Sequence, residues 1–403
     1  MKKLMCYVGL NPVGGSNTQG GIAQTEKPHG GGIAVFEVGK DGCSLTLRGS
    51  VPSPVKAGAL YYAKETQMLY AVDEKKTGGR GEIAGGSSVY AFHVNQESGM
   101  PEYRNHVPSM GANPADVVAI PAKKVLYTAS HGGFEHVEKI VQNADGSFGL
   151  TYEYDDAATA QYAINDDGSI GAVTDVAVHH GHGMDPNPSP QHGGHAQSGS
   201  HAHCTVLDPG KNFLLVGDKG TDRIYVYRVG QELETAFIYQ FGSYSGARHI
   251  AFDPVTGRVY CTLEFSSEIA SFDFDAATGA LHEIDRISTI APDFTGRNEP
   301  ATLRVSPDGR YIYVNNRGED TIVTIEVDAS GHLTRRHAFS LGRSVDPGAA
   351  TRQMELTPDA SFLYVPERPA YAIRILKVHE DGTFSDVNRV PIENPVYICF
   401  VEL

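Results

Sequence analysis

The chain has 403 residues, and its 48 acidic residues outnumber its 33 lysines and arginines, which gives a formal net charge of −15. This acidity argues against nucleic acid or an anionic membrane surface as a partner, because both are normally met by basic patches. The five cysteines are scattered and never spaced as CxxC, and neither a signal peptide nor a transmembrane segment is recognisable. A reduced, cytoplasmic setting is therefore expected.

From its start the chain reads as short strands and tight turns, beginning with LMCYVG at residues 4–9. The clearest unit is LRVSPDGRYIYVNNRGEDTIVTIEV at residues 303–327, where two apolar strands flank the turn SPDG and a third strand follows a polar loop. Proline and glycine in these positions suit a type I turn, and the flanking runs are too short for helices. Similar units begin at His203, His249 and Met354.

The first strand of this unit can be counted along the whole chain. Its positions are Ala59, Asp116, His203, His249, Thr302, Gln353 and Tyr397. Most of them are about fifty residues apart, a spacing typical of propeller blades. The pattern predicts an all-β fold, a seven-bladed β-propeller of four-stranded antiparallel blades. The chain has no tryptophan, so the propeller type that carries a Trp-Asp signature is disfavoured.

The two ends of the chain complement each other. The last unit, PVYICFVEL at residues 395–403, holds one strand, whereas residues 4–9 fit the second-strand pattern. We therefore expect the terminal strands to share one blade and close the ring, which leaves no open propeller edge. All seven units are expected to form one domain, residues 1–403.

The step from Asp116 to His203 is 87 residues long and holds two additional segments. One is an insertion at about 131–158, and the other is a loop rich in histidine, glycine and proline at about 179–203. Neither has a strand or helix period, and long irregular loops in compact domains are often functional or disordered. Seven of the 17 histidines lie in the second segment, so a divalent metal ion there is an alternative, although H-x-H pairs alone are common by chance.

Three consecutive segments carry a resemblance to a known family. They are HAHCTVLDPGKNFLLVGDKGTDRIYVYRV, ARHIAFDPVTGRVYCTLEFSSEIASF and LRVSPDGRYIYVNNRGEDTIVTIEV. In this order they resemble blades of the seven-bladed propeller lactonase family, which includes the propeller type of 6-phosphogluconolactonase and the fungal carboxymuconate lactonizing enzymes. The resemblance covers essentially the whole chain.

The resemblance implies active-site residues at four matching positions. They are His203 in HAHC, Arg248 in GARH, Glu264 after the second strand of that blade, and Arg317 in NNRG. The chain departs from the family pattern at Leu263, where asparagine is common.

These residue types suit the opening of a lactone. Hydrolysis needs a base that activates water and a positive group that holds the carbonyl oxygen as it gains charge. His203 or Glu264 can be the base, while Arg248 and Arg317, together with His201, can bind the substrate and its carboxylate or phosphate. Starts of first strands and ends of second strands share one mouth of a propeller, so these side chains are expected to meet. The expected function is hydrolysis of a small anionic lactone without a cofactor.

Other interpretations stay open. The same carbonyl and carboxylate chemistry fits a lactonizing cycloisomerase, and a propeller can also be a non-catalytic binding module. Arg317 and Glu264 could form a structural ion pair between blades, Arg248 could cap a strand end, and His203 could be a satisfied channel histidine. The oligomeric state cannot be read from the sequence, because the outer strands show no obvious hydrophobic stripe.

Overall fold

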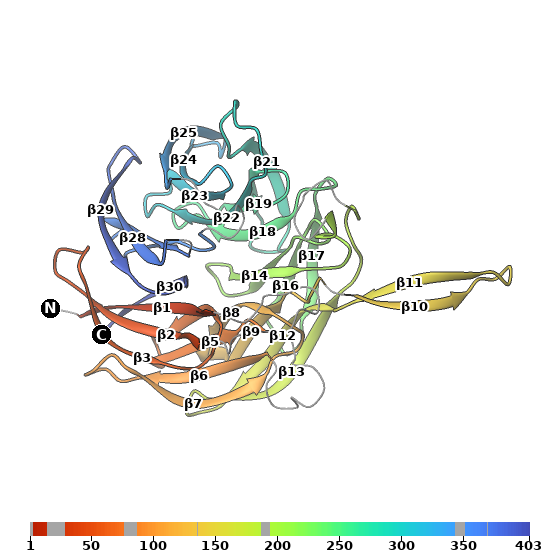
Figure 1. Ribbon diagram of the computed structural model, residues 1–403, viewed down its shortest axis with the longest axis horizontal. Helices are drawn as coiled ribbons and strands as arrows, with labels where there is room; N and C mark the ends of the chain where they lie inside the picture. Colours follow the sequence, from red (N-terminus) through yellow and green to blue (C-terminus); the bar gives the residue numbers. More distant parts are fainter. Residues whose placement is uncertain are drawn as a thin grey trace.

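The computed structural model describes residues 3–13, 29–75, 87–134, 136–186, 194–342, 351–368 and 370–403. Within these ranges the strands form seven four-stranded antiparallel sheets and one separate two-stranded sheet. Figure 1 shows the four-stranded sheets arranged around a ring. The predicted seven-bladed β-propeller is confirmed. Among the described residues, no helix is long and apolar enough to cross a bilayer.

Each blade runs outward from an innermost strand, and the innermost strands of most neighbouring blades contact each other. In chain order, the first blade consists of β4 (Ala57–Ala63), β5 (Met68–Asp73), β6 (Ser88–Val94) and β7 (Pro101–Pro108). The second consists of β8 (Pro114–Ile120), β9 (Val125–Ser130), β12 (Ala157–Ile164) and β13 (Ile170–His179). The third consists of β14 (Ala202–Leu207), β15 (Phe213–Asp218), β16 (Arg223–Arg228) and β17 (Glu234–Gln240). The fourth blade consists of β18 (Ala247–Phe252), β19 (Val259–Leu263), β20 (Glu268–Phe274) and β21 (Leu281–Ser288). The fifth consists of β22 (Glu299–Val305), β23 (Tyr311–Arg317), β24 (Thr321–Val327) and β25 (Leu333–Ser340). The sixth consists of β26 (Glu355–Leu356), β27 (Phe362–Glu367), β28 (Ala372–Val378) and β29 (Phe384–Pro391).

The seventh blade joins the two ends of the chain. Its strand order is β3-β2-β1-β30, with β1 (Leu4–Val13), β2 (His29–Val38), β3 (Leu45–Val51) and β30 (Pro395–Glu402). The C-terminal strand is innermost and pairs along β1, from Leu4 opposite Glu402 to Leu10 opposite Pro395. This is the closure expected from the sequence.

Burial explains why these segments become strands. The second strand of a blade is enclosed on both faces, so β15 and β19 are buried throughout and read as continuous apolar runs. Outermost strands alternate instead, as in β25, because one face meets solvent. Apolar side chains of adjacent blades interlock, for example those of β15 and β19 in one cluster. The predicted turn at Ser306 closes through a 2.9 Å hydrogen bond from the Gly309 amide to the Ser306 carbonyl.

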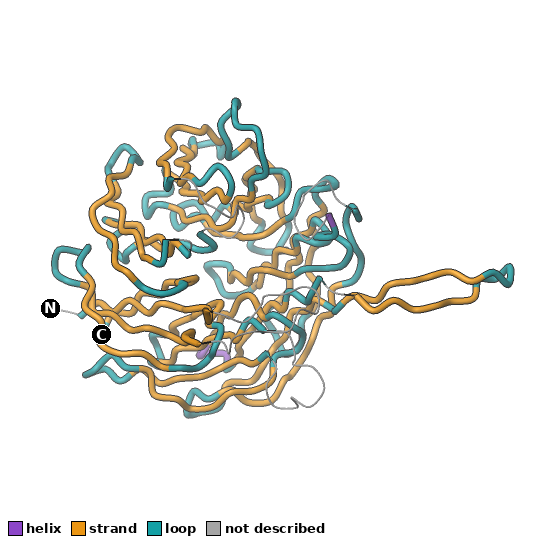
Figure 2. The backbone as a smooth tube through the Cα atoms, viewed as in Figure 1, coloured by secondary structure: helices purple, strands orange, loops and turns teal. Residues whose placement is uncertain are grey.

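One expectation is wrong. The insertion at 131–158 contains regular structure, because β10 (His136–Gln142) and β11 (Phe148–Tyr154) form a hairpin between β9 and β12. Figure 2 shows this hairpin, called the arm below, projecting from the ring. β10 is exposed along its whole length and its sequence does not alternate, whereas β11 alternates, with Phe148, Leu150, Tyr152 and Tyr154 separated by small or polar residues. Part of the histidine-rich loop, residues 187–193, lies outside the described residues.

Candidate active site

Strand register brings the predicted side chains to one end of the ring. Ala247 is paired with Leu263, and Glu299 with Arg317, so the start of each innermost strand lies beside the end of the second strand. Turns such as Ser306–Gly309 lie at the opposite end of the same strands. The structure therefore places His203, Arg248, Glu264 and Arg317 at the same mouth, contributed by three successive blades.

Glu264 is the centre of the cluster. It directly follows β19, its side chain is fully buried, and three cationic groups surround its carboxylate. Lys219 Nζ donates a 3.0 Å hydrogen bond to Oε1, Arg317 Nη2 lies 3.4 Å from Oε1, and Arg248 Nε lies 2.6 Å from Oε2. The ion pair between Glu264 and Arg317 is therefore present in the structure. A buried carboxylate is tolerated only when it is paired in this way.

A backbone contact between Gly246 and Glu264 positions the Glu264 side chain. Gly246 has φ +75°, and a Cβ there would come within 2.5 Å of the Phe265 ring, so glycine is needed at this position. The carbonyl of Gly246 accepts a 2.8 Å hydrogen bond from the Glu264 amide. This bond holds the start of β18, and hence Arg248, next to the residue that follows β19.

A second carboxylate extends the network. Arg317 Nη2 lies 3.2 Å from Glu299 Oε2, and Arg297 Nε donates a 2.7 Å hydrogen bond to Glu299 Oε1. Four cationic side chains thus share two carboxylates here, those of Lys219, Arg248, Arg297 and Arg317. This end of an acidic protein is locally cationic and suits an anionic ligand.

Histidine rings line the same mouth. The rings of His131 and His201 are stacked with centroids 4.4 Å apart, and His203 lies 5.8 Å from His131 and 5.3 Å from His249. Phe134 packs against His201 at 4.6 Å. His201 donates from Nδ1 to the His131 carbonyl at 2.9 Å, so its Nε2 presents a lone pair.

Burial keeps these imidazoles neutral. It lowers the pKa of His201 to about 4, and it lowers the pKa of His203 well below the usual value, with Arg248 as the next largest cause. The guanidinium of Arg248 has a pKa lowered to about 9 by burial and by Arg317, while Glu264 acts in the opposite direction. At neutral pH the histidines are therefore potential proton acceptors, and Arg248 is charged.

Several buried polar atoms at this mouth form no hydrogen bond among the described residues, and three of them bear on the chemistry of the site. They are His201 Nε2, His203 Nδ1 and Arg248 Nη1. Such atoms are rare in folded proteins and call for a ligand or ordered water. A proton acceptor and a guanidinium donor are both available to a bound substrate.

Lys219 and Glu299 are not among the predicted residues, and neither are His131 and Phe134. A signal for Lys219 exists in the repeat itself, because charged residues stand at or directly after the end of the second strand in several blades. They are Glu74, Lys219, Glu264, Arg317 and Glu367. Across the ring Glu74 pairs with Arg352 through two hydrogen bonds of 2.6 and 2.8 Å.

Other histidines of the 179–203 segment have structural partners. His179 Nδ1 donates to Asp218 at 2.8 Å, and its Nε2 accepts from the Tyr227 hydroxyl at 3.0 Å. His195 bonds Asp185 at 2.7 Å. In the part of the chain that the structure describes, no group of three or more His, Cys, Asp or Glu side chains is arranged to hold a metal ion.

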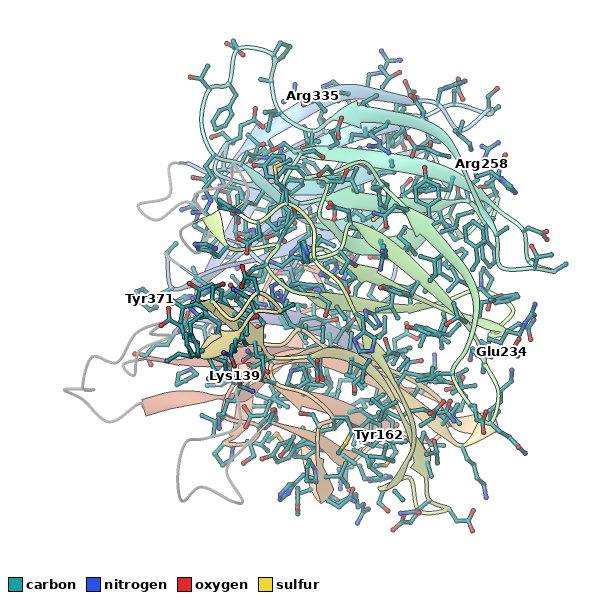
Figure 3. All side chains as sticks on the ribbon, turned by 90° about the vertical axis from the view of Figure 1, so that its right-hand side faces the viewer. Lys139, Tyr162, Glu234, Arg258, Arg335 and Tyr371 are labelled. Carbon is teal, nitrogen blue, oxygen red and sulfur yellow. The ribbon has the colours of Figure 1, made fainter. Side chains whose placement is uncertain are left out.

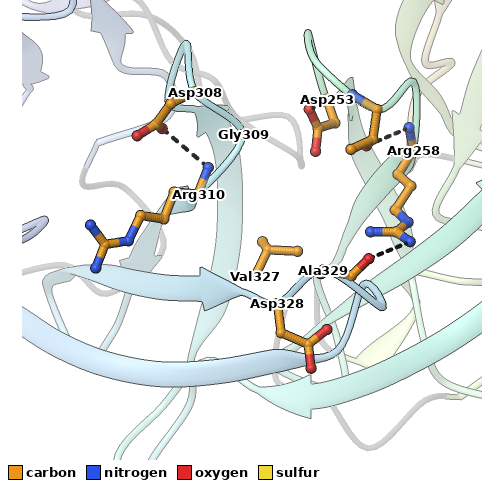
Figure 4. A pocket seen from close by; sticks show the side chains of 9 residues that line it. Asp253, Arg258, Asp308, Gly309, Arg310, Val327, Asp328 and Ala329 are labelled. Atoms are coloured by element: carbon orange, nitrogen blue, oxygen red, sulfur yellow. Dashed lines mark hydrogen bonds between the residues drawn. The ribbon is translucent and has the colours of Figure 1, made fainter.

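Two cavities of the described structure lie away from the predicted residues. One lies at the opposite end and is lined by Asp253, Arg258 and the turn at Asp308 (Figure 4). Its volume is about 210 Å³. Another, of about 350 Å³, lies between β4, β26 and β30 and is lined by Tyr61, Glu355 and Tyr397. The buried polar cluster defines the candidate site better than either cavity, because only the cluster combines charge with unpartnered donors and acceptors.

Comparisons with known proteins agree with this fold. The chain is 27% identical over 339 residues to the 6-phosphogluconolactonase of Bacillus subtilis (strain 168), covering 83% of this chain and 80% of that protein. Among solved structures, a Lactobacillus plantarum protein matches with a TM-score of 0.78 at 26% identity over 100% of both chains. The Pseudomonas aeruginosa periplasmic gluconolactonase has a TM-score of 0.77 at 21% identity, covering 99% of both chains, and shows the fold alone.

The family model described as "Lactonase, 7-bladed beta-propeller" matches residues 19–400, which is nearly the whole chain. The match spans all the blades that contribute to the cationic mouth. The chain belongs to the seven-bladed β-propeller lactonase family.

Proposed function

We propose that this protein hydrolyses a small anionic lactone, a sugar-acid lactone with 6-phosphogluconolactone as the first substrate to test. The observation that carries the proposal is the buried Glu264 carboxylate held by Lys219, Arg248 and Arg317, with the unpartnered Nδ1 of His203 at the same mouth. Family membership and the name of the Bacillus subtilis relative support the substrate class.

In this proposal His203 is the base. Its neutral imidazole takes a proton from water while the water oxygen forms a bond to the lactone carbonyl carbon. The carbonyl oxygen gains negative charge, and Arg248 stabilises it through its available Nη1. The bond between the carbonyl carbon and the ring oxygen then breaks, and the ring oxygen receives the proton from His203. The product is the open hydroxy acid.

Glu264 is the positioning residue rather than the base. Its oxygens already contact three cations, which stabilise the carboxylate and make it a weak proton acceptor. By holding Arg248 and Arg317 in one place it fixes the donors before the substrate arrives. Lys219 completes the set and lies within 5.7 Å of the Phe134 ring and 5.6 Å of the Phe265 ring, which shield its ammonium group.

The charge balance supports an anionic substrate. Four cations face two carboxylates around Glu264, and across the ring Lys56 and Arg352 share Glu74. Arg317, with His201, is proposed to hold the phosphate or carboxylate of the substrate. A bound anion would also favour the imidazolium that forms on His203 during the reaction.

No cofactor is part of this proposal, because the arginines can carry the charge that a metal would otherwise stabilise. Activity is expected to survive complete chelation, as measured by rate alongside metal content. Loss of activity on chelation, with recovery when a divalent ion is returned, would place a metal in the reaction. A cytoplasmic setting is also proposed, in keeping with five free cysteines.

The decisive experiment is acid release at constant pH with 6-phosphogluconolactone, glucono-1,5-lactone and muconolactone, each corrected for its rate in buffer. Wild type is compared with His203→Gln and Arg248→Gln, and with His182→Gln as an exposed control. We expect kcat to fall about 100- to 10,000-fold in His203→Gln, the usual worth of general-base help. No rate above buffer for wild type on any lactone would overturn the proposal and favour a binding module.

A further inference from the structure

The arm formed by β10 and β11 has no covering element among the described residues. Its two strands pair only with each other, and Figures 1 and 2 show them standing away from the ring. Figure 3 looks from the side toward which the arm projects, with Lys139 on it labelled. A lone two-stranded hairpin is at best marginally stable in water. The arm is therefore expected to be stabilised by contact with a partner.

Its register separates two faces. Cross-strand partners lie on the same face, and so do residues two apart along a strand. The apolar arm face consists of four such pairs, His136 with Tyr154, Glu138 with Tyr152, Ile140 with Leu150, and Gln142 with Phe148. The opposite face carries the ion pair of Lys139 with Glu153, together with Val137 and Val141.

The apolar arm face is strongly exposed. The exposed fractions are 76% for Ile140, 73% for Phe148, 58% for Leu150 and 46% for Tyr152. Toward the base, the His136 ring contacts Tyr152 at 4.8 Å and Tyr154 at 5.3 Å, so the stripe continues as an aromatic group. Contiguous exposed apolar patches of this kind mark interaction sites.

We propose that the arm is a dimerisation element, whose apolar arm face packs against the same face of a second copy of this chain around a two-fold axis. When the two arms run antiparallel, β11 of one lies over β11 of the other. Phe148 at the tip of one arm then meets Tyr154 near the base of the other, and Leu150 meets Tyr152. The stripe is thus self-complementary, which an interface between identical surfaces requires.

The area reaches the lower limit for a specific dimer interface. A large apolar or aromatic side chain offers about 150–250 Å² when fully exposed, so the four exposed side chains contribute about 500 Å² per arm. Two arms together bury about 1,000 Å², the size that a specific interface needs to reach. Glu138, His136 and Gln142 lie on the β10 side of the same face and form its polar rim.

The test is the mass of the full chain in solution at micromolar concentrations, by light scattering after gel filtration and by analytical ultracentrifugation. Wild type is expected to be a dimer, and Ile140→Ser/Leu150→Ser a monomer with at least a tenfold weaker dimerisation constant. The matched control is Val137→Ser/Val141→Ser, which removes exposed apolar side chains from the opposite face and is expected to stay a dimer. Circular dichroism shows that each variant keeps its strands.

Cross-linking tests the geometry. Glu138→Cys lies near the proposed two-fold axis and is expected to form a disulfide-linked dimer under mild oxidation, whereas Lys139→Cys on the opposite face is not. Both variants carry the same five native cysteines. A monomeric wild type, a dimer that survives Ile140→Ser/Leu150→Ser, or equal loss in the Val137/Val141 control would each overturn the proposal. A wild type that is monomeric alone but binds lipid vesicles would assign the arm to a membrane instead.

Discussion

Lys219 and Glu264 are joined by a 3.0 Å hydrogen bond in a space that solvent hardly reaches, since their side chains are 6% and 0% exposed. The two residues come from neighbouring blades, and each follows the end of a second strand. Burial lowers the pKa of Lys219, and the Glu264 carboxylate raises it again in opposition. The pair therefore links stability of the ring to the electrostatics of the candidate site.

Replacing Lys219 by methionine tests this link. The variant keeps the apolar stem between Phe134 and Phe265 and removes the charge. Because Arg248 and Arg317 still compensate Glu264, we expect the free energy of unfolding to fall by about 1–3 kcal/mol rather than the full cost of an unpaired buried charge. Urea denaturation measures this. The control is Lys211→Met, which loses an exposed contact with Glu65 at 3.6 Å. It should change the free energy of unfolding by less than about 0.5 kcal/mol.

Glu264→Gln separates positioning from proton transfer. Glutamine preserves the shape but leaves three cations facing one another, so the free energy of unfolding should fall by about 3–5 kcal/mol. Displaced arginines should lower kcat/KM by about 10- to 100-fold, with the acid limb of the pH profile retained. Disappearance of that limb in Glu264→Gln would show that Glu264, not His203, is the base. Glu234→Gln, on an exposed carboxylate, serves as the control.

The pH profile of kcat/KM should report His203. The base must be neutral, and burial together with Arg248 lowers its pKa well below 6.5. Activity is therefore expected to hold from neutral pH to below pH 6.5 and to fall only when His203 is protonated. Initial rates between pH 4 and 8 measure this. A limb centred above pH 6.5, or the same limb in the residual activity of His203→Gln, would contradict the assignment.

Buried histidines should make the fold acid-sensitive. An unfolded histidine has a pKa of about 6.5, whereas that of folded His201 is about 4 because of burial. As pH falls from 6.5 toward 4 the unfolded chain takes up the proton first, so stability is lost over that window by up to about 1.4 kcal/mol per pH unit for each such group. Urea midpoints across the window measure the slope. His201→Gln should flatten it, and exposed His182→Gln should not.

The sequence predicts most of the fold because each blade repeats the same local pattern. Turns such as the one at Ser306 are fixed by proline and glycine close in sequence, and their spacing sets the number of blades. The pairing of Lys219 with Glu264 is not local, since it depends on how neighbouring blades meet, and motif resemblance indicated only one of the two. The arm differs in another way, because β10 is exposed throughout and lacks the alternation that identifies a strand. The alternation of β11 at Phe148, Leu150 and Tyr152 is the signal from which the hairpin could have been predicted.

Closure by the terminal strands leads to a last prediction, on truncation. Removing residues 395–403 deletes β30, the innermost strand of its blade, and exposes the edge of β1 from Leu4 to Leu10. Buried side chains including Val396, Ile398 and Val401 are lost with it, each worth about 1.5–3 kcal/mol. The sum approaches the whole stability of a typical domain, so we expect no cooperative thermal transition.

Replacement of residues 137–153 by a Gly-Ser pair is the matched deletion. It removes more residues, but the arm pairs with none of the described blade strands, so the ring should keep a cooperative transition within a few degrees of wild type. Differential scanning calorimetry compares the two variants directly. A truncated chain that still melts cooperatively would show that the ring does not need β30, because an open edge at β1 would then be tolerated.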